Sequence, residues 1–187
     1  MVEHWSPKPG VTGSSPVTPA KTMDNKKENL KEISEHMKAR KVTTLATSTH
    51  SKDLWTSTVY YGIDDDLNLY FSSNPKTKHA QQIQETGNVA FAISDSDQTI
   101  STKNKQGVYG QGTCTMLTNI KDITKGLKHW NDAHKLKVDT IPLSDFIEKV
   151  TQSKIYKVTP TKLKMFGSTS GEKEIEITLQ KKGTFLE

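Results

Sequence analysis

Residues 69–83, LYFSSNPKTKHAQQI, decide the fold of this chain. The segment begins as a strand in which buried and exposed positions alternate, breaks at residues 72–75 (SSNP) and restarts as a helix. The first turn of that helix, residues 76–79, reads KTKH. Hydroxyl, imidazole and ammonium groups would then surround free helix N–H groups, an arrangement that binds phosphate. A solvent-exposed turn that holds lysines has the same pattern, so this stretch leaves both interpretations open.

The first 22 residues, MVEHWSPKPGVTGSSPVTPAKT, differ in composition from the rest of the chain. They hold four of the seven prolines and show neither a helical nor a strand period. Such a segment buries too little apolar area to offset the entropy lost on ordering, and it lacks the apolar centre of a signal peptide. We expect residues 1–22 to be a disordered extension, with Met23 as a natural start. Residues 23–187 are expected to form one domain.

Composition and charge narrow the classes of function. The hydrophobic fraction is 32% and the formal net charge is +5, with acidic and basic residues interleaved. This modest surplus suits a phosphorylated small ligand, and no run of like charges marks a nucleic-acid-binding arm. The single cysteine, Cys114, excludes an internal disulfide and fits a reducing cytosol. No stretch is long and apolar enough for a membrane span, so we expect a cytoplasmic protein.

Four segments have helical spacing. A capping box at residues 25–28 predicts the start of a helix. The helix that begins within residues 69–83 is expected to end at Gly87, because glycine readily adopts the left-handed conformation that closes a helix. Residues 120–130 and 143–150 are predicted to form two amphipathic helices.

The remaining ordered segments read as short strands. They are residues 42–49, 55–62, 67–71, 88–94, 107–117, 155–159, 163–166 and 175–179. The strand at residues 107–117, GVYGQGTCTML, carries three glycines, which mark a bulge, a barrel corner or the close approach of a backbone or ligand. Seven or so short strands with a few helices predict a mainly β fold, an antiparallel barrel with helical decoration.

Other motifs do not support a metal or hydrolase site. His129 and His134 stand five residues apart, whereas helical metal-binding pairs are usually about four apart, and no acidic or cysteine partner completes a set. Cys114 has no activating base near it in sequence, so an inert buried thiol is expected. The chain contains no GxSxG, Walker or GxGxxG pattern. We therefore expect no metal ligands and assign no catalytic residue.

Aromatic residues gather on two of the predicted strands. Trp55, Tyr60 and Tyr61 lie on one strand, and Tyr109 lies on another. Aromatic strand residues usually pack in a core or at a dimer interface. A flat cofactor between two β-rich walls would use the same residue types, so both interpretations stay open.

Four segments, taken in order, resemble the pyridoxamine 5′-phosphate oxidase-like, FMN-binding split β-barrel family, in particular its small general-stress members. They are the strand meander at residues 44–73, the helix–strand unit at 75–95, the glycine-bearing strand at 107–117 and the strands at 155–166. The second segment, PKTKHAQQIQETGNVAFAISD, is similar to the family's Ser-Arg/Lys-Lys-Ala helix start and the strand that follows it. The resemblance covers residues 28–179 and rests on the order and spacing of the segments.

The resemblance implies a six- to seven-stranded antiparallel split β-barrel with flanking helices. It also implies a homodimer that binds FMN at the subunit interface. Ser73, Thr77 and Lys78 match the positions that contact the FMN phosphate, and His79 matches a second basic position in the vitamin B6 enzymes. Cations and N–H donors are what such a phosphate requires, in agreement with the pattern of the opening stretch.

The resemblance extends to the part of the site that would hold the flavin ring. Thr58, Val59 and Tyr60 lie on the strand whose backbone follows the isoalloxazine edge, and Gln111 lies on the glycine-bearing strand near the cofactor. Two features depart from the vitamin B6 enzymes. Thr58 stands where those enzymes have a basic residue, and the chain ends without their basic substrate-binding motif. Vitamin B6 synthesis is therefore not expected.

The resemblance indicates an FMN-dependent oxidoreductase whose substrate and electron donor are unassigned. A non-catalytic flavin- or haem-binding protein of the stress-response type is the alternative, because no general acid or base is evident. Haem or a deazaflavin in place of FMN stays open. A barrel that binds nucleic acid through Trp55 and the tyrosines is a distant third hypothesis, and no nucleic-acid partner is expected.

Overall fold

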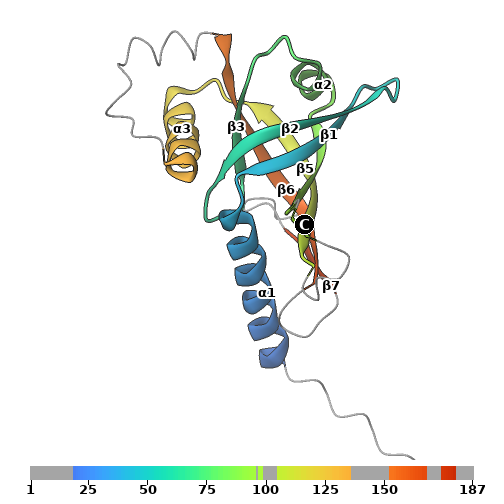
Figure 1. The fold of residues 1–187 in the computed structure, drawn as a ribbon, viewed down its shortest axis with the longest axis vertical. Coiled ribbons are helices and arrows are strands. Elements are labelled where there is room, and N and C mark those ends of the chain that lie inside the picture. The colour runs from blue at the N-terminus through green and yellow to red at the C-terminus, as the bar shows by residue number, and fades with distance from the viewer. Residues whose placement is uncertain (1–18, 96, 99–104, 136–151, 168–173, 180–187) are drawn as a thin grey trace, which may run out of the picture.

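The computed structural model describes residues 19–95, 97–98, 105–135, 152–167 and 174–179 (Figure 1). In chain order the elements are α1 (Pro19–Ala39), β1 (Val42–Ser48), β2 (Leu54–Ile63), β3 (Leu69–Ser73), α2 (Lys78–Thr86), β4 (Asn88–Ser94), β5 (Gly107–Met116), α3 (Ile120–His134), β6 (Lys154–Phe166) and β7 (Glu174–Thr178). Strands outnumber helices within these ranges, so the fold is mainly β.

The strands form one antiparallel sheet that closes on itself. The strand order is β3-β2-β1-β4-β5-β6-β7, and an additional pairing between β3 and β6 closes the first six strands into a barrel. β7 continues the sheet beyond β6. These pairings confirm the predicted six- to seven-stranded antiparallel split β-barrel with flanking helices.

β6 is one strand of 13 residues, although the sequence predicted two shorter strands. The register between β5 and β6 shifts between Gln111 and Gly112, so that Gly112 pairs with Pro160 and Gln111 pairs with Lys162. Thr161 is the extra residue of this β-bulge. Proline cannot donate a ladder hydrogen bond, and the bulge lets the strand pass Pro160 without ending.

The core lies inside the barrel and is built from side chains that alternate along the strands. Leu45 of β1, Phe91 of β4 and Leu163 of β6 are buried there. Tyr61 of β2 is also buried, and its hydroxyl donates a hydrogen bond of 2.6 Å to the carbonyl of Met37 in α1. This bond ties the end of α1 to the barrel.

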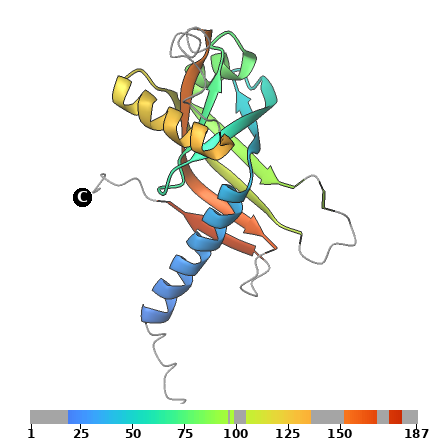
Figure 2. The same cartoon turned by 60° about the vertical axis from the view of Figure 1, so that its left-hand side comes forward.

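α1 meets the barrel at its C-terminal end and extends away from it toward its N-terminus (Figures 1 and 2). It begins at Pro19, ahead of the predicted capping box. Proline is favoured in a first helical turn, and the residues that follow contain neither glycine nor a further proline, so the helix continues through the box. Residues 19–22 of the predicted extension thus belong to α1, and residues 1–18 lie outside the described ranges.

The two shorter helices pack against the barrel. α2 follows β3 and is closed by Gly87, whose φ of 67° is left-handed as predicted. α3 packs on β2 and β3, and a Cβ added to Gly62 would lie 2.2 Å from the carbonyl oxygen of His129. The predicted helix at residues 143–150 lies outside the described residues. In the part of the chain that the structure describes, no helix is both long and apolar enough to cross a membrane.

Candidate functional site

Three polar side chains meet where β3 ends and α2 begins. Ser73 is the last residue of β3, Thr77 is the N-cap of α2, and His79 lies in its first turn. His79 Nε2 lies 2.7 Å from Ser73 Oγ and 3.2 Å from Thr77 Oγ1, and the two hydroxyl oxygens lie 3.2 Å apart. We call Ser73, Thr77 and His79 the hydroxyl–imidazole cluster. The structure thus brings together two of the three residues predicted to contact a phosphate, Ser73 and Thr77, with His79, which was matched to a second basic position.

Asn74 shapes the turn that returns Thr77 to Ser73. Its side-chain oxygen accepts a hydrogen bond of 2.9 Å from the Lys76 N–H, and its carbonyl accepts bonds from the N–H and the hydroxyl of Thr77. The Thr77 backbone is extended, and its side chain makes no capping bond to the helix. The first N–H groups of α2 therefore lack a threonine cap and can donate to a bound anion.

The hydroxyl–imidazole cluster lies in a partly apolar environment. Ser73 and His79 are only 8% and 9% exposed, and the Phe71 ring centre lies 6.4 Å from that of the imidazole. Burial lowers the pKa of His79 below its ordinary value of 6.5, because desolvation disfavours the charged ring. The imidazole is therefore neutral at neutral pH. The cluster offers hydrogen-bonding groups without a formal charge, and the cation for an anionic ligand has to come from a neighbouring residue.

The side chain of Lys78, the third predicted phosphate contact, lies at the start of β2. Its Nζ atom lies 2.9 Å from a carboxylate oxygen of Asp53 and 4.7 Å from the ring centre of Trp55. The ion pair and the cation–π contact draw the ammonium group toward the turn between β1 and β2. Asp53 and Trp55 were not predicted as partners of Lys78, because nothing in their local sequence links them to a helix that starts 23 residues after Trp55.

The three predicted residues of β2 face alternate sides of the sheet. Thr58 and Tyr60 are exposed, whereas Val59 points into the barrel and is 7% exposed. The carbonyl of Tyr60 accepts a hydrogen bond of 3.2 Å from the indole N–H of Trp130 in α3. The side chains of Thr58 and Tyr60 therefore face outward, away from the core that contains Val59.

An open groove of about 530 Å³ lies across β1, β4, β5 and β6 and reaches the start of β2, and its volume is in the range of small-molecule sites. Its lining residues are uncharged: Ala46, Thr47, Ser48, Leu54, Asn88, Val89, Ala90, Gln111, Gly112, Thr113 and Thr161. Gln111 is the predicted site residue that lines this groove. The amide and hydroxyl groups of this lining can hydrogen-bond the edge of a ligand.

Ser57 is a residue that the sequence did not single out. Its hydroxyl is buried and has no hydrogen-bond partner within the described residues. Strand alternation puts it on the same side of β2 as Trp55 and Val59. A buried hydroxyl without a partner is costly and is therefore a candidate ligand contact. In the sequence, the two-residue spacing from Trp55 indicates that Ser57 shares a face of the strand with it. Every strand has this spacing, so it does not identify Ser57 as a ligand contact.

The two histidines of α3 pack against aromatic rings, and the cysteine is buried. The His129 ring stacks on Tyr70 at 5.4 Å, and the His134 ring lies 4.9 Å from Trp130. Among the residues that the structure describes, no three His, Cys, Asp or Glu side chains gather to hold a metal ion. Cys114 is buried, and burial raises the pKa of its thiol to about 12, which agrees with the prediction of an inert thiol.

Comparison with known proteins gives a fold and no closer relationship. No protein-family model matches the chain, and no curated protein sequence matches it. A heme binding protein from Mycobacterium smegmatis aligns with a TM-score of 0.61 and 16% identity over 81% of this chain and 57% of that protein. ChuZ from Campylobacter jejuni aligns with a TM-score of 0.63 and 13% identity over 79% of this chain and 58% of that protein.

A third solved structure is described as a pyridoxamine 5′-phosphate oxidase-related, FMN binding protein from Nostoc punctiforme. It aligns with a TM-score of 0.51 and 14% identity over 86% of this chain and 90% of that protein. The chain spans less than two thirds of the length of the other two proteins. At these identities the comparison shows a shared fold, and that fold is the antiparallel split β-barrel.

Proposed function

We propose that this protein binds FMN and is a cytosolic, flavin-dependent oxidoreductase of the pyridoxamine 5′-phosphate oxidase-like type. The observation that carries the proposal is the hydroxyl–imidazole cluster at the uncapped N-terminus of α2. The fold supports it, because one solved structure that shares the fold is described as an FMN binding protein. A single buried cysteine, Cys114, is in keeping with a reducing compartment.

The residues present fit the phosphate of FMN. The hydroxyl of Ser73 can donate to a phosphate oxygen, and that of Thr77 can do so when its hydrogen turns away from the Asn74 carbonyl, to which it donates at 2.8 Å. The first N–H groups of α2 add further donors. The buried hydroxyl of Ser57 would gain the partner that it lacks among the described residues. His79 would donate its ring N–H, and Lys78, next to Thr77 in the chain, would supply a positive charge.

The flat ring would lie against the outer face of β2, β1, β4 and β5. Thr58 and Tyr60 stand on this face of β2, and the uncharged groove with Gln111 lies further along it. Tyr60 and Tyr109 are exposed aromatic residues on the same sheet. We propose that a second copy of the chain covers this face and that FMN lies between the two subunits, because small uncharged side chains flanked by aromatics suit such an interface.

Bound FMN would supply hydride and electron transfer. The chain would bind the phosphate through the hydroxyl–imidazole cluster, and the carboxamide of Gln111 would orient the ring edge. Main-chain groups of β2 near Thr58 and Val59 would add hydrogen bonds from the strand. No side chain is assigned as a general acid or base, and the substrate and electron donor stay unassigned.

A non-catalytic flavin- or haem-binding protein is the second candidate. One observation favours haem, namely that a solved structure with the same fold is described as a heme binding protein. A phosphate-binding cluster favours FMN, because haem carries carboxylates and no phosphate. The two candidates differ in their absorption spectra and in whether the bound group turns over.

The test is an absorption spectrum of the purified protein before and after dialysis against FMN, followed by addition of NADH or NADPH. We expect the two visible bands of oxidised flavin to stay with the protein. The bands should bleach with the reductant and return when an electron acceptor is added. Retained flavin that does not bleach would favour the non-catalytic candidate. Retention of added haem together with no retention of FMN would overturn the proposal.

A further inference from the structure

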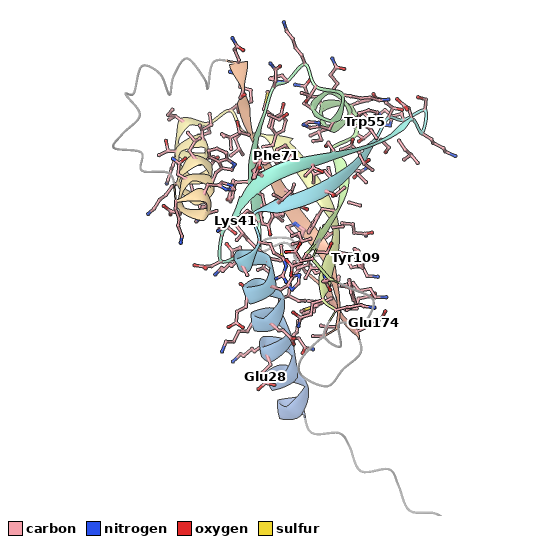
Figure 3. The ribbon with its side chains drawn as sticks, in the orientation of Figure 1. Glu28, Lys41, Trp55, Phe71, Tyr109 and Glu174 are labelled. Atoms are coloured by element: carbon pink, nitrogen blue, oxygen red, sulfur yellow. The ribbon has the colours of Figure 1, made fainter. Side chains whose placement is uncertain are left out.

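Asp53 is fixed next to Lys78 by its own main chain. Its N–H donates a hydrogen bond of 3.0 Å to the Thr49 hydroxyl, and its carbonyl accepts bonds of 3.1 Å from the Thr49 N–H and 3.0 Å from the Gln82 side-chain amide. The turn between β1 and β2 is therefore closed on itself and tied to α2. Figure 3 shows Trp55 at this end of the barrel, beside α2.

The link to α2 is buried and hydrogen-bonded. Gln82 is 2% exposed, and its side-chain oxygen accepts a hydrogen bond of 2.6 Å from the Thr47 hydroxyl. One helical turn separates Gln82 from Lys78. The main chain at Asp53 is thus held by the same helix whose first residue pairs with the Asp53 carboxylate. The ion pair therefore joins two residues whose main chains are tied to each other through Gln82.

The ion pair with Asp53 neutralises the positive charge of Lys78, which an anion at the hydroxyl–imidazole cluster would use. The hydroxyl–imidazole cluster is formally neutral, because burial keeps His79 uncharged. Lys78 lies between Thr77 and His79 in the chain, and its charge is already matched by Asp53 at 2.9 Å. A phosphate group at the cluster and the carboxylate of Asp53 both offer anionic oxygens as acceptors for the Lys78 ammonium group, so the two would compete for it.

We propose that Asp53 competes with the phosphate of the ligand for Lys78 and thereby sets the affinity and specificity of this site. The inference rests on the proposed function, since the ligand is taken to be FMN. A phosphate monoester carries nearly two negative charges at neutral pH and displaces a carboxylate, which carries one. A flavin without phosphate cannot displace it. Asp53 thus weakens the binding of phosphorylated ligands and leaves that of their neutral forms unchanged, so it limits how strongly the site prefers a phosphate.

The expected size of the effect follows from the exposure of the pair. The side chains of Lys78 and Asp53 are 43% and 53% exposed, so solvent screens their attraction. Removing the competing carboxylate should tighten FMN binding by about two- to fivefold. Riboflavin binding should not change, because riboflavin has no group that interacts with Lys78.

The test is a titration of FMN and of riboflavin by quenching of flavin fluorescence on a set of variants. The set contains wild type, Asp53→Asn, Lys78→Ala and the double variant. Asp65→Asn is the matched control, because Asp65 forms an exposed ion pair of 2.8 Å with Lys38 and its loss changes the net charge equally. We expect Asp53→Asn alone to tighten FMN binding, and we expect that gain to vanish in the Lys78→Ala background.

Other results would overturn the inference and identify the reason. Weaker or unchanged FMN binding in Asp53→Asn would show that Asp53 orients Lys78 or does not touch it. Equal tightening in Asp65→Asn, or persistence of the gain without Lys78, would assign the effect to net charge. Failure of the wild type to bind FMN would instead overturn the proposed function. Asp53→Ala, measured alongside with its circular dichroism spectrum, covers the case in which Asp53→Asn does not fold.

Discussion

Ser73 Oγ and His79 Nε2 lie 2.7 Å apart across the turn that joins β3 to α2. The contact joins the end of a barrel strand to the first turn of a helix, so the strand, the turn and the helix position one donor set. Both residues are buried, which strengthens each polar interaction made there. The relationship leads to the first prediction, which concerns the two hydroxyls of the cluster.

Replacement of Ser73 and Thr77 by alanine should weaken FMN binding by at least about tenfold, because each hydrogen bond to a charged phosphate contributes roughly 1.5–3 kcal/mol. Riboflavin binding should stay near the wild-type value. Thr77 makes no capping bond, so α2 should persist in the double variant. Thr124→Ala on α3 is the control, since it removes a hydroxyl that bonds within its own helix. Equal losses for FMN and riboflavin would count against a phosphate site.

Much of this site could be predicted because it is local in sequence. Ser73, Thr77 and His79 lie within seven residues, so a strand, a Pro75-containing turn and a helix start suffice to bring them together. Gly87 as the end of α2 could be predicted for the same reason, since the left-handed closing residue depends on the helix that it ends.

The direction of the Lys78 side chain could not be predicted, because it depends on contacts with Asp53 and Trp55. Those two residues are distant in sequence and are brought next to α2 by the pairing of β1 with β2. A lysine at a helix start has the same local pattern whether it faces a ligand or an acidic neighbour. The continuity of β6 was missed for a related reason. The local sequence predicts that a strand ends at Pro160, and it is the bulge opposite Gly112 that permits the strand to continue.

Two buried tyrosines should respond differently to loss of their hydroxyl groups. Tyr61 donates a bond of 2.6 Å to Met37, so Tyr61→Phe should lower the free energy of unfolding by about 1 kcal/mol. Tyr156 is equally buried, and its hydroxyl has no partner among the described residues, so Tyr156→Phe should be neutral or stabilising. Urea unfolding of both variants measures the difference. A larger loss in Tyr156→Phe would mean that its hydroxyl has a partner in the folded protein.

A side chain at position 62 should destabilise the fold. A Cβ at this position would lie 2.2 Å from the backbone carbonyl of His129, and a helix backbone cannot move aside as a flexible side chain can. Gly62→Ala should therefore lower the free energy of unfolding by about 1–3 kcal/mol. The comparison variant is Gly87→Ala, where the nearest atom is 3.8 Å away and the cost comes only from the left-handed backbone. Equal midpoints in urea for wild type and Gly62→Ala would contradict this packing of α3.

His36 should make the folded protein lose stability in mild acid. It is buried on α1, its Nε2 lies 3.4 Å from the Ile93 carbonyl, and it faces Arg40, Asp95 and Gln106. Burial, followed by the positive charge of Arg40, lowers the pKa of His36 below its ordinary value of 6.5.

The sign of the pH dependence follows from this depressed pKa. The unfolded chain binds a proton at higher pH than the folded chain does, so the contribution of His36 is fully present above pH 6.5 and is lost as the pH falls through the folded pKa. The free energy of unfolding, measured in urea between about pH 7.5 and about pH 5.5, should therefore decrease. His36→Gln should reduce that decrease without abolishing it, because burial also lowers the pKa values of His79 and His134. An identical slope in wild type and His36→Gln would show that His36 accepts its proton without cost in the folded state.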